Sequence, residues 1–264
     1  MTGLRQKFEL TRRAALAGMA AGAGMVALAS VARAQKPVQQ KITLTLPGGK
    51  QVSAALFLPL SLPAPAIVVA PNRFGLVDST LDRIGSLAFD HYLVVAVDLY
   101  DGVVAGNPTE AQALEGGLDR ALAFNTVMAW ADWIRADARC NRNIGLMGFG
   151  LGGGLVLDAA LVATVLGTVI YDAPILRRPE QLARLTSPLL GHYSDRDLQF
   201  TVGQQEDVQY QLQKANKRSR LYSYDAEVDF ANLGSPNYSR SDALLAWNRS
   251  VAFFRATVGA GGSG

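Results

Sequence analysis

A glycine-rich stretch in the middle of the chain constrains the fold more than any other feature. The sequence GLMGFGLGGG, residues 145–154, follows a short apolar run and precedes a longer one. Apolar segments on both sides of closely spaced glycines predict a strand, a tight turn and a helix. Such a turn is typical of proteins in which parallel strands alternate with helices.

The rest of the chain repeats this alternation. Apolar runs at AIVVAP and YLVVAVDLY flank a helical pattern over residues 79–89, a long helix is expected over residues 109–136, and further strands are expected at GTVIYD, PLLGHYSD and RLYSYD. KITLTL and QVSAALFL, on either side of Pro47, Gly48 and Gly49, predict an antiparallel hairpin. We therefore predict an α/β fold: a doubly wound, mostly parallel sheet entered by an antiparallel hairpin.

In such sheets the ligand crevice lies at the carboxyl ends of the strands. The loops expected there are residues 71–77, 98–106, 148–154, 172–178, 194–199 and 225–237.

The first 34 residues have the pattern of an export signal. Arg12 and Arg13 precede a moderately apolar run. This run is followed by Ala32, Arg33 and Ala34, which match the Ala-x-Ala pattern of a cleavage site. Paired arginines indicate the twin-arginine pathway, and a general secretory signal is the alternative. We predict cleavage after Ala34, a periplasmic or secreted protein, one domain over residues 35–258, and a flexible tail over residues 259–264.

Charge and composition exclude several classes of function. The predicted signal contains five of the 25 basic residues and one of the 22 acidic ones, so the mature chain has a net charge of about −1. No basic patch indicates nucleic acid, and we expect no stable membrane insertion after cleavage. Cys140, His91 and His192 are the only cysteine and histidines and are far apart in the sequence, which predicts neither a disulfide nor a metal site.

Two functional interpretations fit the glycine turn. Gly148, Gly150 and Gly153 match the G-x-G-x-x-G pattern of dinucleotide binding, with Asp172 placed to bind a ribose hydroxyl and Arg177 and Arg178 to meet a 2′-phosphate. The turn also matches a nucleophile elbow, in which the residue at Gly150 would attack a carbonyl. The number of strands ahead of the turn favours the elbow.

Seven ordered segments resemble the dienelactone hydrolase family of the α/β-hydrolase superfamily. They are IVVAPNRFGL, YLVVAVDLY, IGLMGFGLGGG, VIYDAP, PLLGHYSDRD, YSYDAEVDFAN and AWNRSVAFF, within residues 40–256. The resemblance implies a cysteine nucleophile, a histidine base and an orienting aspartate. It places the nucleophile at Gly150, the aspartate at Asp197, with Asp195 as a substitute, and the histidine at Val228 or Asp229.

The accessory positions are changed as well. The resemblance implies a glutamate where this chain has Asn72, and carboxylate-binding arginines at Asp101 or Gly102 and at Asn232. What remains is an oxyanion site formed by the N–H of Leu151 and by Arg73 or a neighbouring N–H.

These losses predict a protein without cysteine-type hydrolysis, which binds a small molecule or an unknown protein partner in the inherited crevice and needs no cofactor. One alternative is hydrolysis by water activated between Asp197 and Asp229. The other is the nucleotide-binding oxidoreductase.

Overall fold

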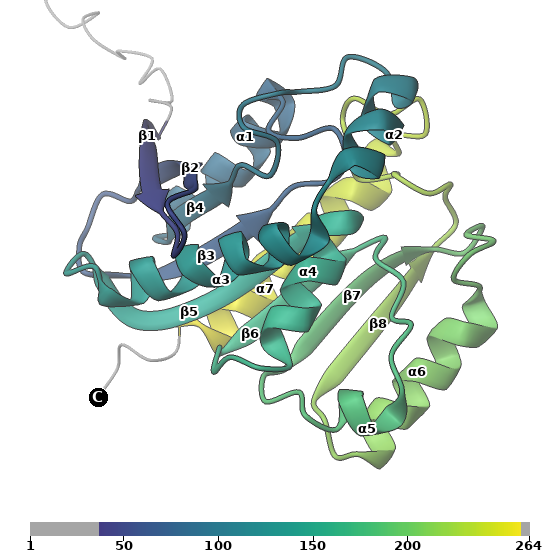
Figure 1. Cartoon of the computed structure of the whole chain (residues 1–264). Coiled ribbons are helices and arrows are strands. Elements are labelled where there is room, and N and C mark those ends of the chain that lie inside the picture. Colours follow the sequence, from purple (N-terminus) through teal and green to yellow (C-terminus); the bar gives the residue numbers. More distant parts are fainter. Residues whose placement is uncertain (1–36, 260–264) are drawn as a thin grey trace, which may run out of the picture. The chain divides into compact units, whose positions relative to one another are not determined.

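Residues 37–259 are described by a computed structural model, in which helices cover both faces of one eight-stranded sheet (Figure 1). The strand order is β1-β2-β4-β3-β5-β6-β7-β8. The strands are β1 (Val38–Thr45), β2 (Gln51–Leu58), β3 (Ala64–Ala70), β4 (Leu93–Val97), β5 (Cys140–Phe149), β6 (Gly167–Tyr171), β7 (Leu189–Ser194) and β8 (Ser219–Tyr224). The hairpin of β1 and β2 joins β4 in antiparallel register, and all other pairs are parallel. The predicted fold and its entry hairpin are confirmed.

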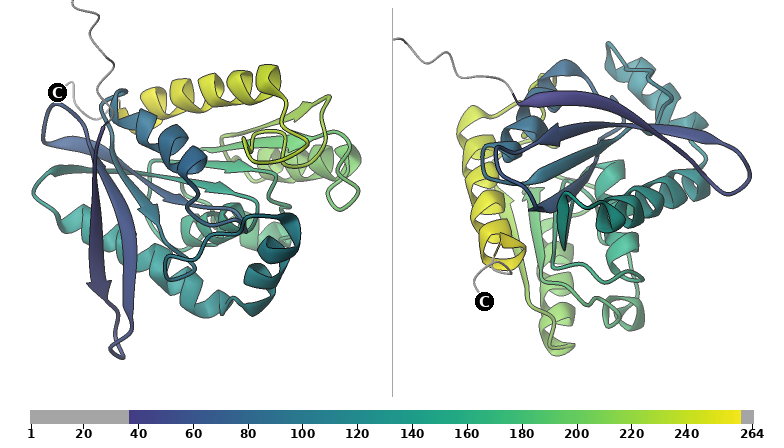
Figure 2. Two further views of the ribbon diagram at one scale, coloured as in Figure 1. Left: turned by 90° about the horizontal axis from the view of Figure 1, so that it is seen from above. Right: turned by 90° about the vertical axis from the view of Figure 1, so that its left-hand side faces the viewer.

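Helices pack on the sheet from two sides (Figure 2). One apolar core includes residues of α3 (Arg120–Ala136), α4 (Leu151–Ala160), α5 (Pro179–Leu182) and α6 (Val202–Lys214). The other includes residues of α1 (Asp78–Gly85), the short helix η1 (Ser86–Ala88) and α7 (Arg240–Thr257). A further helix, α2 (Pro108–Gly117), precedes α3.

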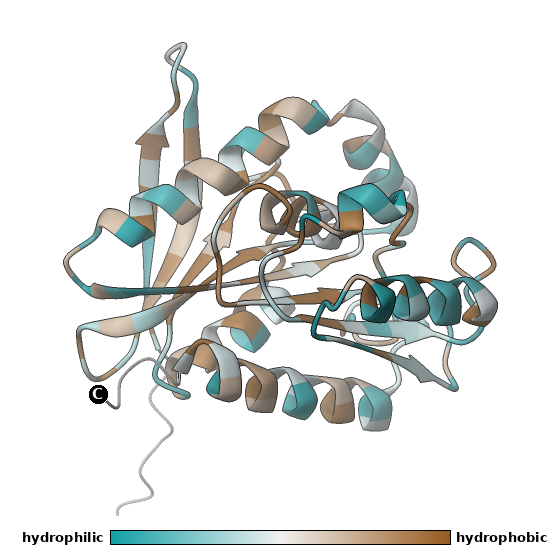
Figure 3. Ribbon diagram, turned by 90° about the horizontal axis from the view of Figure 1, so that it is seen from below, coloured by the Kyte–Doolittle hydropathy of each residue, from teal (hydrophilic) through white to brown (hydrophobic). Residues whose placement is uncertain are grey.

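Alternating strand residues supply the two cores. Val68 and Val95 face one helical layer, whereas Ile67 and Val94 face the other, and all four are fully buried. Strands buried on both faces need apolar residues at every position, which explains the continuous apolar runs in the sequence. The hydropathy colouring shows mainly brown central strands and strongly hydrophilic turns along α6 (Figure 3).

The prediction of one continuous helix over residues 109–136 is wrong, because the structure has two helices there. The structure ends α2 at Gly117 and begins α3 at Arg120. Gly116 and Gly117 disfavour a continued helix, and the Asp119 carboxylate accepts hydrogen bonds from the N–H groups of Ala121 and Leu122, which starts a new one.

The predicted export signal and its cleavage site lie outside the described residues, as does the tail beyond Gly259. Among residues 37–259, no helix combines the length and apolar character needed to cross a membrane.

Candidate functional site

A cleft of about 670 Å³ lies at the carboxyl ends of the parallel strands. Loops after β3, β5, β6, β7 and β8 form its walls, together with the junction between α2 and α3. The lining residues are Asn72, Arg73, Glu115, Arg120, Gly150, Leu151, Gly154, Asp172, Ala173, Pro174, Leu176, Arg177, Arg196, Asp197, Leu198, Gln199, Val228 and Asp229. The structure thus brings together all seven residues predicted for the site: Asn72, Arg73, Gly150, Leu151, Asp197, Val228 and Asp229.

Gly150 forms the sharp bend between β5 and α4. Its backbone has φ 49° and ψ −118°, a conformation that residues with a Cβ adopt only under strain. Its N–H donates to the carbonyl of Tyr171 over 2.8 Å, which fixes the bend to the end of β6. A Cβ built at Gly150 would have only the Asn72 Cβ nearby, at 3.7 Å. The geometry of a nucleophile elbow is therefore present. There is room for a side chain at this position, but glycine provides none.

Neighbouring glycines are required by close packing. A Cβ on Gly148 would lie 2.4 Å from the carbonyl oxygen of Gly152, and one on Gly152 would lie 2.3 Å from that of Pro71. These contacts explain the glycine spacing without a bound pyrophosphate. Arg177, the candidate for a 2′-phosphate, instead forms a bidentate ion pair with Asp158 of α4, at 2.8 and 2.9 Å.

Asp197 lies in the loop after β7 and is 6% exposed. Its Oδ1 accepts hydrogen bonds from the N–H groups of Gln199 (2.7 Å) and Phe200 (3.1 Å), which hold the carboxylate in place. Asp195, the substitute position, is not among the residues that line the cleft.

Asp229 lies in the loop after β8, and its Oδ2 is 3.4 Å from Nη2 of Arg73. Burial raises the pKa of Asp229, while the charge of Arg73 opposes this shift and that of Glu115 adds to it. No hydrogen bond joins Asp229 to Asp197 within the described residues, so the two predicted carboxylates do not form a direct pair.

Asp172, at the end of β6, is a functional candidate that the sequence predicts only as a ligand of a nucleotide ribose. It is 9% exposed and accepts hydrogen bonds from the N–H groups of Ser194 (3.2 Å) and Asp229 (3.0 Å). Burial, together with the negative charges of Asp229 and Asp197, raises the pKa of Asp172 to about 7, although the two N–H groups oppose this shift. The signal in the sequence that could have identified Asp172 as a site residue is its position directly after a buried strand.

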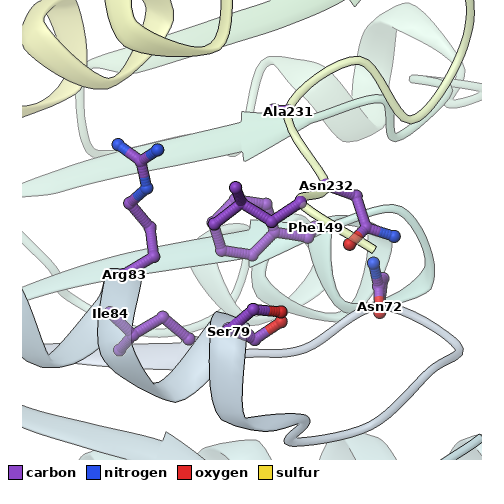
Figure 4. A pocket seen from close by; sticks show the side chains of 9 residues that line it. Asn72, Ser79, Arg83, Ile84, Phe149, Ala231 and Asn232 are labelled. Carbon is purple, nitrogen blue, oxygen red and sulfur yellow. The ribbon is translucent and has the colours of Figure 1, made fainter. Parts of the chain in front are cut away.

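Asn72 and Asn232 meet at a smaller pocket of about 30 Å³, separate from the cleft except for Asn72 (Figure 4). The Nδ2 atom of Asn232 is buried there without a hydrogen-bond partner. Asp101, the other position expected for an arginine, pairs with Lys50 at 2.7 Å and does not line the cleft. Neither position provides a cation for an anionic ligand in the cleft.

The cysteine and the histidines lie away from the cleft. Cys140 is buried at the opposite end of β5, where burial raises the pKa of its thiol. His192 is fully buried between Tyr224 and Ser250, to which its two ring nitrogens bind. His91 is exposed in a turn. Among residues 37–259, no three His, Cys, Asp or Glu side chains are grouped to hold a metal ion.

Comparison with known proteins identifies the family of this chain. The family model of the dienelactone hydrolase family matches residues 52–258. The chain belongs to the dienelactone hydrolase family. Curated relatives include carboxymethylenebutenolidase 1 of Cupriavidus pinatubonensis, 23% identical over 80% of this chain and 94% of the relative. Carboxymethylenebutenolidase of Pseudomonas putida is 25% identical over 78% and 91% of the two chains.

Solved structures agree with the fold. Dienelactone hydrolase from Anabaena variabilis superposes with a TM-score of 0.68 at 18% identity, covering 85% of this chain and 100% of the other. Membership of the dienelactone hydrolase family lends no support to the dinucleotide-binding interpretation.

Proposed function

We propose that this member of the dienelactone hydrolase family has lost cysteine-type hydrolysis and binds a small molecule in the cleft. The observation that carries the proposal is Gly150, which occupies the elbow without a nucleophilic atom. Among the described residues that line the cleft there is also no serine, threonine, cysteine, histidine, lysine or tyrosine. A covalent acyl intermediate needs a nucleophile and a base within reach of each other, and the cleft offers only carboxylates.

Two features support retention of a binding role. The cleft volume of about 670 Å³ falls within the range of ~300–1,000 Å³ that is common for small-molecule sites. Leu151 begins α4 beside the empty elbow, where the first-turn N–H groups of a helix have no intrahelical acceptor. Together with Arg73, this end of the helix would receive a carbonyl or another hydrogen-bond acceptor of the ligand.

The test is an assay of the purified chain with activated esters and dienelactones, alongside a Cys140→Ala variant. We expect turnover no faster than the uncatalysed reaction and no acyl adduct in the mass spectrum of the protein. Turnover well above background that survives Cys140→Ala would show that another group in the chain performs the chemistry, and the proposal would fail.

A second candidate function is hydrolysis by carboxylate-activated water. The observation that favours it is the pKa of Asp172, about 7, because a general base or acid works best when its pKa is near the working pH. Asp172 lines the cleft together with Gly150, whose missing side chain leaves space for a water molecule. If this function operates, Asp172→Asn abolishes turnover, whereas Asp195→Asn, outside the cleft, does not.

We also propose export to the periplasm or the medium, with cleavage after Ala34. The support is the Arg12-Arg13 pair and the Ala-x-Ala sequence described above. Cell fractionation and N-terminal sequencing would test this. We expect the exported protein to begin at Gln35 and expect Arg12→Lys with Arg13→Lys to block export; an uncleaved cytoplasmic protein would contradict it.

A further inference from the structure

Every arginine that lines the cleft is already paired with a carboxylate. The pairs are Arg73 with Asp229 (3.4 Å), Arg120 with Glu115 (3.5 Å), Arg177 with Asp158 (2.8 Å), and Arg196 with Asp225 and Glu227. An anionic ligand would therefore have to displace an existing partner to reach any of these guanidinium groups. This arrangement disfavours the carboxylate-bearing substrates that the family resemblance implies.

Some of the carboxyl groups at the cleft have no arginine to neutralise them. Four carboxyl groups line it, and four more, at Asp158, Asp195, Asp225 and Glu227, pair with its arginines from outside. Four arginines line it as well, and each pairs with at least one of these carboxyl groups. Two of the lining carboxyls, Asp172 and Asp197, have no cationic partner there. Because the arginines are paired and these two carboxyls are not, the cleft favours a ligand with a positive charge over one with a negative charge.

Asp197 carries a more specific signal than the absence of a cationic partner. Both of its hydrogen bonds involve Oδ1, and Oδ2 accepts none from the described residues although the residue is 94% buried. The family resemblance assigns Asp197 to binding a histidine N–H, but Val228 offers only hydrocarbon. Oδ2 is not among the fully enclosed polar atoms that lack a partner, and Asp197 lines the cleft, so this oxygen is open to the cleft, where an N–H group of a ligand can donate to it.

The walls of the cleft are apolar on one side. Leu198 is 91% exposed and Leu176 62% exposed, and both line the cleft together with Pro174 and Ala173. Large apolar side chains at the rim of a concave site are typical of ligand contact. They complement a hydrocarbon or aromatic body rather than a small hydrophilic ion.

We propose that the cleft binds an organic cation: an ammonium or amidinium group that donates to Oδ2 of Asp197, attached to an apolar body that packs against Leu176 and Leu198. This inference rests on the proposed binding function and names the class of ligand. The carboxyl of Asp172 lies near enough to Asp197 for their charges to interact and contributes to the same negative field.

The test compares three probes that share one aromatic body: phenethylamine, phenethyl alcohol and phenylpropionate. Calorimetric titration of the full chain near pH 7.5 should show phenethylamine binding roughly tenfold or more tightly than phenylpropionate, with phenethyl alcohol between them. Raising the salt concentration should weaken binding of the amine more than that of the alcohol.

The Asp197→Asn variant tests whether the ammonium group of the ligand binds at Asp197. The amide oxygen of asparagine can still accept the N–H groups of Gln199 and Phe200, while the negative charge is lost. We expect this variant to lose about tenfold in affinity for phenethylamine and to keep its affinity for phenethyl alcohol. Asp195→Asn is the matched control, because it removes the same charge two residues away and outside the cleft; its effect should stay within about twofold.

Three outcomes would overturn the inference. They are phenylpropionate binding as tightly as phenethylamine, no binding of phenethylamine, or an unchanged amine affinity in a folded Asp197→Asn variant. The first outcome leaves the proposed binding function intact, whereas ester turnover would remove that function itself. If Asp197→Asn does not fold, two measurements on the unmodified chain still test the inference. They are the three-probe series and the backbone amide NMR signal of Gln199, which should shift on addition of phenethylamine.

Discussion

Oδ2 of Asp172 accepts a hydrogen bond of 3.0 Å from the backbone N–H of Asp229. This contact joins the end of β6 to the loop after β8 and holds two carboxyl-bearing residues at one side of the cleft. Because Asp172 is buried and next to a second negative charge, the pKa of its carboxyl rises to about 7. Because this carboxyl is protonated differently in the folded and the unfolded chain, the stability of the fold depends on pH up to about neutrality.

Asp172→Asn should change how stability depends on pH. Below the ordinary pKa of 3.8, Asp172 is protonated in both the folded and the unfolded chain and contributes nothing to the pH dependence. Between that value and about 7 the unfolded chain releases the proton and the folded chain keeps it, so rising pH destabilises the fold by on the order of 4 kcal/mol. In thermal melts from pH 4 to 8, the unmodified chain should lose stability relative to Asp172→Asn as the pH rises, and this difference cancels the opposite contribution of His192, which both chains share.

Asparagine suits this test because residue 172 has φ 45°, a left-handed conformation that asparagine tolerates well. Asp195→Asn serves as the control for the change in net charge, and its pH profile should run parallel to that of the unmodified chain. Parallel pH profiles of Asp172→Asn and the unmodified chain would contradict a raised pKa at Asp172.

The fold could be predicted from the sequence because its determinants are local. Apolar runs such as those at Ile67 and Val94 specify buried strands, and the glycines near Gly150 specify the bend between β5 and α4. The break before Arg120 was missed because apolar periodicity continues across it, while the two glycines and the Asp119 cap that interrupt it are weak signals.

The site was predicted as a set of positions but not as a network. The carboxyl ends of parallel strands must meet at one edge, so Asn72, Gly150, Asp197 and Val228 were expected near one another. The pairing of Asp229 with Arg73, rather than with Asp197, depends on how long loops approach in space. The pKa of Asp172 depends on burial by the same loops, and no sequence spacing encodes that.

His192 should remain neutral in the folded chain at mildly acidic pH. Its ring is fully buried between the hydroxyls of Tyr224 (2.8 Å) and Ser250 (3.0 Å), and burial, assisted by the charge of Arg249, lowers its pKa to about 3. Since the unfolded chain binds a proton below about pH 6.5, the contribution of His192 to the stability of the fold falls as the pH decreases from 6.5 toward 3. NMR of the ring nitrogens should show no protonation of His192 down to pH 4.

His192→Gln provides the matching stability measurement. It should lower the melting temperature at neutral pH, because losing a buried hydrogen bond costs about 1–3 kcal/mol, but it should reduce the further loss at acidic pH. His91→Asn, in an exposed turn with φ 69°, is the control for replacing a histidine outside the core, and it should change the melting temperature little at neutral pH. Protonation of His192 in the folded chain above pH 5 would refute this account of the core.

Gly150→Cys should destabilise the fold through the backbone alone. The nearest atom to a new Cβ is 3.7 Å away, so there is no clash, but φ 49° with ψ −118° costs a residue with a Cβ about 1 kcal/mol or more. Gly154→Cys is the control: it lies within α4 with no atom within 4 Å of a built Cβ and should be neutral or stabilising. Denaturant unfolding measures both, and a Gly150→Cys variant as stable as the unmodified chain would argue against a strained elbow.

Restoring two side chains should restore thiol chemistry, if the cleft keeps the geometry of the family. Gly150→Cys supplies the nucleophile, Val228→His supplies the base, and the buried carboxylate of Asp197 is available to orient the imidazole. In a Cys140→Ala background, Gly150→Cys alone should react slowly with activated esters, and adding the histidine should accelerate acylation by roughly 10²–10⁴-fold. Release of nitrophenol and an acyl adduct in the mass spectrum measure this gain. Asp229→His with Gly150→Cys tests the other position proposed for the imidazole, and equal rates for both pairs and the single variant would mean that neither position reaches the elbow.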